Sequence, residues 1–336
     1  MKAAVIGCGN ISKMHFIALS GNPETEIVAV ADIKPERADG MAEKYGAKAY
    51  YSFDELLEKE KPDVIHICTP HYLHTEMAVK ALSKGINVLT EKPCSTTAEE
   101  VDALRKAQSE SGKQVGVCFQ NRFNSAVQNA KNILNSGSMG KVRAVRAFVT
   151  WFRDKEYYSD DWHGTLEKEC GGVLINQAIH TVDLIQYFGG KCRRLDAHIS
   201  NDSLKGVIEV EDTASVRMEL DGGVTAVLYA TTAFAENSDV FIEILTENGK
   251  LRLEGEKLFV FDKNGKATEV QCDSEIVYHG ESYWGSGHSA LINDFYDCIK
   301  NGTKFEIDAY EGGHAAKIVT ASYRSAQTNQ TISIDL

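Results

Sequence analysis

The sequence lacks the features that mark a disulfide-stabilised, metal-binding or membrane-spanning protein. Its 8 cysteines are scattered and form no CxxC pair, which predicts mostly buried, reduced thiols and no metal site. No apolar run approaches the ~20 residues needed to span a bilayer. The N-terminus shows no succession of charged, apolar and small residues of the kind found in export signals. We therefore expect a soluble cytoplasmic protein without a membrane partner.

The sequence also lacks an excess of basic residues. Its formal net charge is -12 at pH 7, which argues against nucleic acid and anionic membrane surfaces as partners, since both need a basic protein surface. With 336 residues and no internal repeat or low-complexity tract, the chain has room for two domains with separate cores. These absences leave a small-molecule enzyme or binding protein as the expected class.

The first motif present is the stretch KAAVIGCGNIS near the N-terminus. An apolar run suited to a buried parallel strand leads into Gly7-x-Gly9-x-x-Ser12, and residues 10–19 then read as a helix. Gly7 allows a sharp turn, and Gly9 lets a pyrophosphate approach the backbone amides at the helix N-terminus. By itself the motif is equally compatible with a glycine turn that binds nothing, because Ser12 stands where Gly or Ala is usual.

A second apolar strand favours the dinucleotide interpretation. Residues 27–31 are followed by Asp32, at about the expected ~20 residues after the glycines. An acid at that point accepts hydrogen bonds from the adenosine ribose hydroxyls and repels a 2′-phosphate, so we expect NAD rather than NADP. Lys34, two residues later, is a nearby cation that would favour NADP.

The first third of the chain alternates strand and helix patterns in the way that builds a parallel sheet. We expect a Rossmann dinucleotide-binding domain over residues 1–120. Its further helices are expected near 35–45, 53–60, 72–84 and 97–111, and its further strands at 64–68, 86–90 and 114–119.

Beyond residue 120 the pattern changes to an α+β domain with a largely antiparallel, open-faced sheet, expected over residues 121–336. Residues 214–221 alternate apolar and polar side chains, and glycine-containing turns at 221–223, 247–249 and 263–265 separate similar segments. A helix at 122–137 and a strand at 142–151 precede them. Two helices, 287–300 and 311–327, follow, and the C-terminal helix has the option of packing back on the first domain.

The segment GGVLINQAIHTVDLIQYF, residues 171–188, is the most informative part of the second domain. If it is helical, Asn176, His180 and Asp183 fall at i, i+4 and i+7 on one narrow arc, opposite an apolar side. Two interpretations remain open from this pattern alone. The polar stripe faces solvent, or it faces a reaction site.

Five motifs occur in one order along the chain and together carry a family resemblance. They are Gly7-Cys8-Gly9-Asn10-Ile11, Thr69-Pro70 with Leu73-His74, Glu91-Lys92-Pro93, Gln120-Asn121-Arg122-Phe123, and Asn176-Gln177-x-x-His180-Thr181-x-Asp183. In this combination the sequence resembles the glucose-fructose oxidoreductase, inositol dehydrogenase and rhizopine-catabolism family (Gfo/Idh/MocA). The resemblance extends over essentially the whole chain.

The resemblance implies site residues position by position. Lys92 and His180 are the implied catalytic pair, with Asn176 on the substrate. The residues implied to bind the dinucleotide are Gly7, Gly9, Asn10, Ile11, Asp32, Thr69, Pro70, His74 and Glu91. In this family substrate and nicotinamide meet between the two domains, and the open sheet often forms an oligomer interface, which implies a homodimer or homotetramer here. His163 after Trp162 departs from the arginine of many members.

Elementary chemistry agrees with the implied pair. Oxidation of a secondary alcohol removes a hydroxyl proton while hydride leaves, and a neutral histidine, with an ordinary pKa near ~6.5, accepts that proton at working pH. His180 is therefore the candidate base. Lys92, a cation at the carboxyl end of a strand, is placed to stabilise the same oxygen. Asn176 and Asp183 are candidates for orienting substrate and imidazole.

Several other residues keep two interpretations. Arg122 contacts substrate or simply begins a helix, and we count it with the substrate-binding residues. Trp162 belongs to an aromatic group that comprises Trp151, Phe152, Tyr157, Tyr158 and Trp162. This group either serves packing or an oligomer contact, or it forms a platform on which a sugar ring stacks. His15 and His66 are expected to be structural. Five further histidines, His71, His163, His279, His288 and His314, have no partner at metal-ligand spacing, so no metal is expected.

The sequence thus predicts an NAD(P)-dependent dehydrogenase acting on a secondary hydroxyl of a sugar, sugar derivative or cyclitol. Two alternatives belong to other classes. One is a hydrolase that oxidises a sugar transiently, eliminates an aglycone and reduces the product with the same cofactor. The other is a sensor that binds dinucleotide without turnover, against which the joint presence of Lys92 and His180 argues.

Overall fold

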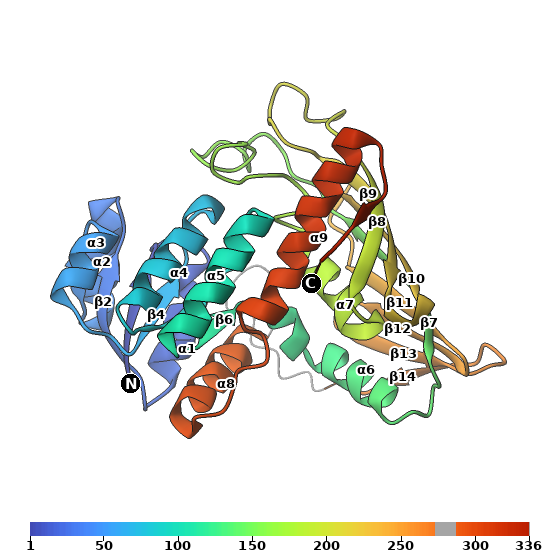
Figure 1. The fold of residues 1–336 in the computed structure, drawn as a ribbon, viewed down its shortest axis with the longest axis horizontal. Coiled ribbons are helices and arrows are strands. Elements are labelled where there is room, and N and C mark those ends of the chain that lie inside the picture. The colour runs from blue at the N-terminus through green and yellow to red at the C-terminus, as the bar shows by residue number, and fades with distance from the viewer. Residues whose placement is uncertain (273–286, 336) are drawn as a thin grey trace. The chain divides into compact units, whose positions relative to one another are not determined.

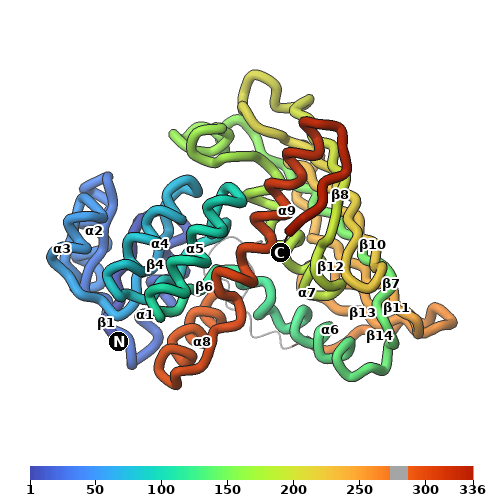
Figure 2. Tube along the Cα trace, viewed as in Figure 1, coloured from blue at the N-terminus to red at the C-terminus, as the bar shows by residue number. Residues whose placement is uncertain are grey.

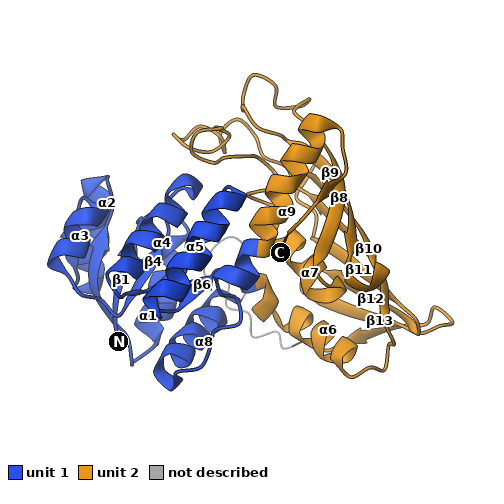
Figure 3. Ribbon diagram, in the orientation of Figure 1, with its two compact units in different colours: residues 1–120, 286–313 blue, residues 121–285, 314–336 orange. Residues whose placement is uncertain are grey.

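The computed structural model describes residues 1–272 and 287–335, and the chain divides into two compact units (Figure 3). Unit 1 comprises Met1–Gln120 and Ser286–Gly313, and unit 2 comprises Asn121–Gly285 and His314–Leu336. The first segment of unit 1 ends at Gln120, where the sequence analysis places the boundary, and the chain returns to unit 1 at Ser286, within the range expected for a second domain whose C-terminal helix has the option of packing back on the first.

Unit 1 contains a six-stranded, all-parallel sheet with the strand order β3-β2-β1-β4-β5-β6 (Figure 1). The strands are β1 Lys2–Ile6, β2 Glu26–Ala31, β3 Lys48–Tyr50, β4 Val64–Ile67, β5 Asn87–Thr90 and β6 Val115–Val117. The order reverses between β1 and β4, and in open parallel sheets ligands bind at the carboxyl ends of the strands at such a reversal. The predicted Rossmann fold is confirmed.

Helices of unit 1 connect these strands. They are α1 Ser12–Gly21, α2 Pro35–Tyr45, α3 Phe53–Lys59, α4 His74–Ser83 after the short 3-10 helix η1 His71–Leu73, α5 Ala98–Ser111 and α8 Gly287–Asn301. The helix expected from residue 97 starts one residue later because Thr97 caps it, accepting a hydrogen bond from the Glu100 amide at 3.1 Å. Helix α8 lies beside α1 (Figure 2).

The return of the chain to unit 1 is explained by close packing of α8 on the sheet. A Cβ atom added to Gly116 in β6 would lie 2.7 Å from Cδ1 of Leu89 and 2.8 Å from Cδ2 of Phe295. Phe295 is fully buried, so glycine at this strand position makes room for the helix. Nothing in the local pattern of residues 287–300 indicates which domain they join.

Unit 2 contains a nine-stranded sheet with the order β14-β13-β12-β11-β7-β10-β9-β8-β15. Its strands are β7 Val142–Thr150, β8 Cys192–Ser200, β9 Thr213–Leu220, β10 Thr225–Thr231, β11 Phe241–Thr246, β12 Gly249–Glu254, β13 Lys257–Phe261, β14 Ala267–Val270 and β15 Ile332–Ser333. Within the described chain, neighbouring strands run antiparallel except for the β7–β10 pair. The predicted largely antiparallel sheet is confirmed.

The two faces of this sheet differ. Along β9, buried side chains at 214, 216, 218 and 220 alternate with more exposed ones, as the sequence predicts. The helices of unit 2 are α6 Ser125–Asn135, α7 Ile179–Gly189 and α9 Ala309–Thr328, of which the residues up to Gly313 belong to unit 1. The 3-10 helix η2 Gln120–Phe123 precedes α6, and the 3-10 turn η3 Asp221–Gly223 joins β9 to β10. Helix α7 packs on β7, β10 and β11, while their other face carries several exposed apolar side chains.

The conditional expectation of one helix over 171–188 is wrong for its first half. Residues 171–178 form turns, and α7 begins only at Ile179. A Cβ atom at Gly172 would lie 1.9 Å from the carbonyl oxygen of Glu211, and the Glu211 carboxylate accepts hydrogen bonds from the amides of Gly172 and Leu174 at 2.8 and 3.0 Å. These contacts hold the start of the segment against a distant residue, and its backbone bonds are irregular: the Asn176 amide donates to the carbonyl oxygen of Gly172 at 3.0 Å, but the Ala178 amide donates to that of Val173 at 2.8 Å. Asn176 therefore does not share a helix with His180 and Asp183.

Two predictions from composition can also be compared with the structure. The cysteines are free thiols, five of them buried and three partly exposed. Within the described residues, no helix combines the length and the apolar character needed to cross a membrane.

Candidate active site

The glycine motif occupies the turn between β1 and α1, at the point where the strand order of unit 1 reverses. Gly7 has φ +86°, and a Cβ atom there would lie 2.5 Å from the carbonyl oxygen of Cys68, so glycine is required. A Cβ atom at Gly9 would meet nothing within 4 Å, which leaves open space beside the start of the helix. Helix α1 starts at Ser12 rather than at Asn10, and within the described chain no side chain caps its first turn.

Serine at the third small position is accommodated by an internal hydrogen bond. The Ser12 hydroxyl donates to the carbonyl oxygen of Gly9 at 2.7 Å, and the residue is fully buried. The departure from the usual Gly or Ala therefore leaves the turn intact. Asn10, which is exposed, and Ile11, which is half-buried, border the same turn.

Asp32 follows β2 and its carboxylate is held in place by the backbone. One oxygen accepts a hydrogen bond from the Cys8 amide at 2.8 Å, and the other accepts one from the Lys34 amide at 2.8 Å. The first bond ties the acid directly to the glycine turn. Each oxygen retains acceptor capacity for a ligand, because a carboxylate offers about four lone-pair sites.

These features fit a bound dinucleotide. The open space at Gly9 and the uncapped amides of α1 suit a pyrophosphate, since helix N-termini bind anions. The oriented carboxylate of Asp32 suits a ribose diol. The glycine turn and Asp32 are linked directly, because the amide of Cys8, between the two glycines, donates a hydrogen bond to the Asp32 carboxylate.

Thr69 and Pro70 follow β4 and are half-buried, whereas His74 is completely buried behind them. Nδ1 of His74 lies 2.7 Å from the carbonyl oxygen of Pro93, and Nε2 lies 2.7 Å from that of Thr69. Carbonyl oxygens only accept, so both contacts are full hydrogen bonds only in the imidazolium. Burial lowers the pKa of His74 and outweighs the two carbonyls, which raise it. We infer that His74 shapes the loop rather than touching a ligand.

The segment Glu91-Lys92-Pro93 follows β5 and lies at the carboxyl edge of the sheet. Glu91 is 4% exposed, Lys92 is half-buried, and the Lys92–Pro93 peptide bond is cis. The Glu91 amide donates to the carbonyl oxygen of Ile67 at 2.8 Å, which fixes this segment against the end of β4. Lys92 therefore emerges at the edge where the glycine turn ends β1.

One group of described residues offers metal-ligand atoms close together: His15, Glu91 and Cys118, with those atoms within 4.8 Å of one another. All three are buried, and Nε2 of His15 already lies at hydrogen-bond distance, 3.0 Å, from Glu91. Burial, and secondarily the charge of Glu91, raises the pKa of Cys118 well above its ordinary value, which disfavours the thiolate that a metal needs. We assign no metal to this group.

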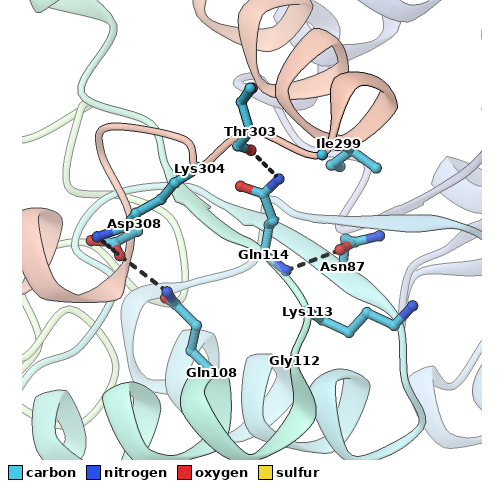
Figure 4. A pocket seen from close by; sticks show the side chains of 10 residues that line it. Asn87, Gln108, Gly112, Lys113, Gln114, Ile299, Thr303, Lys304 and Asp308 are labelled. Carbon is cyan, nitrogen blue, oxygen red and sulfur yellow. Dashed lines mark hydrogen bonds and ion pairs between the residues drawn. The ribbon is translucent and has the colours of Figure 1, made fainter.

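A surface hollow of about 480 Å³ lies at the opposite, amino end of β5 and β6 (Figure 4). Its polar groups are bonded to one another: the Gln114 amide donates to Asn87 Oδ1 at 3.0 Å, and Gln108 Nε2 donates to Asp308 Oδ2 at 3.0 Å. None of the predicted site residues lines this hollow. We interpret it as a hydrogen-bonded seam between α5, β6 and the segment after α8.

In unit 2, the loop before α7 holds Asn176 in a buried polar cluster. Its Nδ2 donates to Glu169 Oε1 at 2.5 Å and lies 3.5 Å from the hydroxyl of Tyr157. Burial, followed by the charge of Glu169, raises the pKa of Tyr157. No local pattern marks Glu169, one of two acids in Glu167-Lys168-Glu169-Cys170, because it becomes relevant only when the loop of Asn176 folds back on it.

His180 is the second residue of α7 and is half-buried, whereas Asp183, one turn later, is 1% exposed. The Asp183 carboxylate accepts two hydrogen bonds from Arg122, from Nε at 2.7 Å and from Nη2 at 2.6 Å. The guanidinium also lies 4.6 Å from the ring centroid of Tyr187. Two predicted substrate-binding residues are thus a buried ion pair that anchors η2 to α7, and the solvent-facing interpretation of this stripe is wrong for Asp183.

The aromatic group includes the predicted residue Trp162, which is half-buried with its ring centroid 3.8 Å from that of His163. His163 in turn contacts Asp160 Oδ2 at 2.6 Å through Nδ1 and lies 4.8 Å from the Tyr157 ring. Through Tyr157 these rings connect to the loop of Asn176. Packing is thus one role of the group, and its half-buried tryptophan leaves surface for a ligand.

Comparison with protein-family models matches both parts of the chain. Residues 1–119 match the model GFO_IDH_MocA, described as an oxidoreductase family with an NAD-binding Rossmann fold. Residues 127–252 match the GFO/IDH/MocA C-terminal domain. Together the two matches cover well over half of the chain.

Comparisons with individual proteins agree. The scyllo-inositol 2-dehydrogenase (NAD(+)) of Bacillus subtilis is 25% identical, over 98% of this chain and 96% of that protein. The D-glucoside 3-dehydrogenase of Escherichia coli is 26% identical, over 99% of this chain and 97% of that protein. The crystal structure of the WlbA dehydrogenase from Bordetella pertussis, in complex with NADH and UDP-GlcNAcA, is 28% identical with a TM-score of 0.87, over 100% of this chain and 99% of that chain.

Proposed function

The chain belongs to the Gfo/Idh/MocA family of NAD-binding oxidoreductases, and from this membership we propose that it oxidises a secondary hydroxyl of a sugar, sugar derivative or cyclitol. It is an NAD-dependent dehydrogenase acting on CH-OH groups. The proposed substrate class is supported by the names of its relatives, which cover an inositol, a glucoside and a nucleotide-sugar acid.

One observation within unit 1 carries the proposal. The carboxyl edge of its sheet presents both the glycine turn with its attached acid, Asp32, and the reactive cation Lys92 after β5. A dinucleotide pocket and an ammonium group at one edge suit redox chemistry on a bound alcohol. A binding protein needs only the first.

The chain's own residues divide the reaction between them. Bound NAD supplies the acceptor for the hydride that leaves the carbinol carbon. His180 takes the hydroxyl proton, Lys92 donates a hydrogen bond to the same oxygen as negative charge develops, and Asn176 orients the substrate. The Arg122–Asp183 pair anchors the helix that carries His180 and does not itself touch the reacting atoms.

The test of this proposal is a screen of sugars, sugar acids and inositols with NAD+ and with NADP+, following absorbance of the reduced cofactor. We expect turnover with members of one of these classes. Release of an aglycone without net reduction of the cofactor would instead support the hydrolase alternative.

Cofactor preference provides a specific prediction for Asp32. Its carboxylate opposes a 2′-phosphate, so we expect kcat/KM with NAD+ to exceed that with NADP+ at least ~10-fold, since like-charge juxtaposition costs several kcal/mol. Asp32→Ser should lower that ratio at least ~10-fold while keeping an acceptor for the two amides. Asp54→Ser, an exposed acid of α3, is the matched control. A clear preference of the parent for NADP+ would mean that Lys34 outweighs the acid.

We also propose that the open face of the unit 2 sheet forms a homodimer or homotetramer contact. Phe148, Val227, Tyr229 and Leu245 on the adjacent strands β7, β10 and β11 are 38%, 46%, 39% and 49% exposed. Tyr229 is directly opposite Phe148 in the register and Val227 is two residues from Tyr229 on the same strand face, so these three side chains are contiguous, while the Arg146–Glu243 ion pair lies between them and Leu245. Contiguous apolar patches of this kind mark interaction sites.

Light scattering on a size-exclusion column tests the assembly. We expect a mass of two or four times 37.0 kDa for the parent and a shift toward the monomer for Tyr229→Glu, because its cross-strand neighbours Phe148 and Ser215 offer no charge to pair with the buried carboxylate. Leu166→Glu, a change at a residue that is 63% exposed and outside the sheet, should leave the mass unchanged. A monomeric parent would contradict the assigned interface.

A further inference from the structure

A chain of buried polar side chains lies beneath the Glu91-Lys92-Pro93 segment in unit 1. Its members are His15 of α1, His66 of β4, Glu91 after β5 and Tyr296 of α8, and each is at most 4% exposed. Three elements that are far apart in sequence thus direct polar groups toward one carboxylate. The sequence predicts His15 and His66 to be structural and says nothing of their partners.

The contacts are short and continuous. The Tyr296 hydroxyl lies 2.8 Å from His66 Nε2, His66 Nδ1 lies 2.7 Å from His15 Nδ1, and His15 Nε2 lies 3.0 Å from Glu91 Oε1. The second Glu91 oxygen accepts a hydrogen bond from the Lys92 amide at 3.3 Å. The carboxylate therefore stands between the histidine chain and the backbone of the proposed catalytic lysine.

The chemistry of the groups gives the chain a direction. An ionised carboxylate only accepts, so His15 donates to it through Nε2–H, and in the tautomer with that single ring proton Nδ1 accepts. His66 must consequently donate from Nδ1–H, which leaves its Nε2 to accept from the Tyr296 hydroxyl. Burial is the main cause that lowers the pKa of His66 well below its ordinary value, consistent with a neutral ring there. Every donor points toward Glu91.

The environment of Glu91 keeps it ionised despite its burial. Burial by itself raises the pKa of this carboxyl, but the hydrogen bond from His15 and the nearby ammonium group of Lys92 lower it. His288 Nε2 of α8 lies 3.8 Å from the same oxygen. The titratable groups that face Glu91 are His15, His66, His74, His288, Lys92, Cys68 and Cys118.

We propose that Tyr296, His66 and His15 are positioning residues, a one-directional hydrogen-bonded chain that fixes the Glu91 carboxylate and through it the backbone of Lys92. The inference rests on the proposed function in one respect, because Lys92 is assigned to the reaction there. Misplacement of a catalytic group by about 1 Å costs on the order of 100-fold in rate. A rigid anchor beneath a flexible lysine is therefore useful to the reaction.

Hydrogen exchange at the Lys92 amide tests the anchor without any substrate. In His15→Leu the donor to Glu91 is lost, and we expect this amide to exchange at least ~10-fold faster than in the parent. His15→Gln should return exchange toward the parental rate, since its side-chain amide replaces Nε2–H. Tyr296→Phe removes only the first donor and gives a smaller increase of about 3-fold. Ser20→Leu, an exposed change on the same helix, is the control.

Activity provides the second readout. With kcat and KM measured across pH, His15→Leu should lower kcat between ~10- and ~100-fold with little change in KM. His15→Gln, which keeps a side-chain N–H donor, should restore part of kcat. Unchanged exchange at Lys92 in His15→Leu and Tyr296→Phe would overturn the proposal, whether or not the parent turns over a sugar. Absence of turnover in the parent would count against the proposed function alone.

Histidine tautomers test the direction of the chain. Nitrogen NMR of protein labelled in its histidine rings should show protons on Nε2 of His15 and Nδ1 of His66, and Tyr296→Phe should shift the His66 signals first. A proton on Nε2 of His66 would overturn the assigned direction. Finding one equivalent of bound metal with the His15 ring as a ligand would overturn the chain itself.

Discussion

Replacing Lys92 by Met is expected to lower kcat at least ~100-fold while NAD affinity stays close to that of the parent. Methionine keeps an unbranched stem and removes the ammonium group, so the loss measures one acid-base or oxyanion-type contribution. The segment around Lys92 should stay in place, because two hydrogen bonds that hold it have backbone donors. The Glu91 amide donates to the Ile67 carbonyl, and the Lys92 amide donates to the Glu91 carboxylate. Steady-state kinetics give kcat, and a fluorescence titration with NADH gives the cofactor affinity.

Lys84→Met is the matched control, since Lys84 is an exposed lysine of the same unit at the end of α4. It should keep parental kcat and cofactor affinity. If Lys92→Met bound NAD normally and turned over at close to the parental rate, the catalytic assignment of Lys92 would be wrong. The sensor alternative, which needs the pocket and not the ammonium, would then regain support.

Replacing His180 by Ala is expected to lower kcat by about 100- to 10,000-fold with nearly unchanged cofactor affinity, the range that one general base contributes. His180 acts on the substrate proton and not on the dinucleotide, so the effect should appear in kcat. Its place in the first turn of α7, above the buried Arg122–Asp183 pair, means that truncation removes the imidazole without disturbing the anchor of the helix.

His198→Ala is the control for this variant, because His198 is an exposed histidine on β8 of the same unit. Added imidazole should restore part of the activity of His180→Ala and leave His198→Ala unchanged. Near-parental turnover by His180→Ala would remove this residue from the mechanism, and the proton acceptor would have to be sought elsewhere.

The elements predicted from sequence are those with strong local signals. Helix α2 starts at Pro35 and ends before Gly46, which adopts the left-handed conformation. The proline and the glycine are both helix-boundary signals that can be read from the sequence. Strand β3, with three residues, is too short to show a period, and β15, with two, exists only because it pairs with β8. Length and tertiary pairing thus separate the predicted elements from the missed ones.

The sequence predicts those parts of the site whose function depends on the spacing of nearby residues. It does not predict the parts whose side chains are held by residues far away in the sequence. The glycine turn and Asp32 carry their chemistry in their spacing. The polar stripe of residues 176–183 did not, because Glu169 binds Asn176 and Arg122 binds Asp183 from other parts of the chain. The hydrogen bonds from His66 to His15 and from His15 to Glu91 join residues 51 and 76 positions apart, beyond any periodic pattern.

The most direct test of the central claim follows the hydrogen itself. A sugar or cyclitol that the substrate screen identifies is prepared with deuterium at the oxidised carbon and incubated with the protein and NAD+. The account predicts that deuterium appears on the nicotinamide ring of the product NADH, in stoichiometric amount with the ketone formed, and that Lys92→Met and His180→Ala slow this transfer. Loss of the deuterium to water, or product formed without any labelled NADH, would contradict oxidation by direct hydride transfer to NAD.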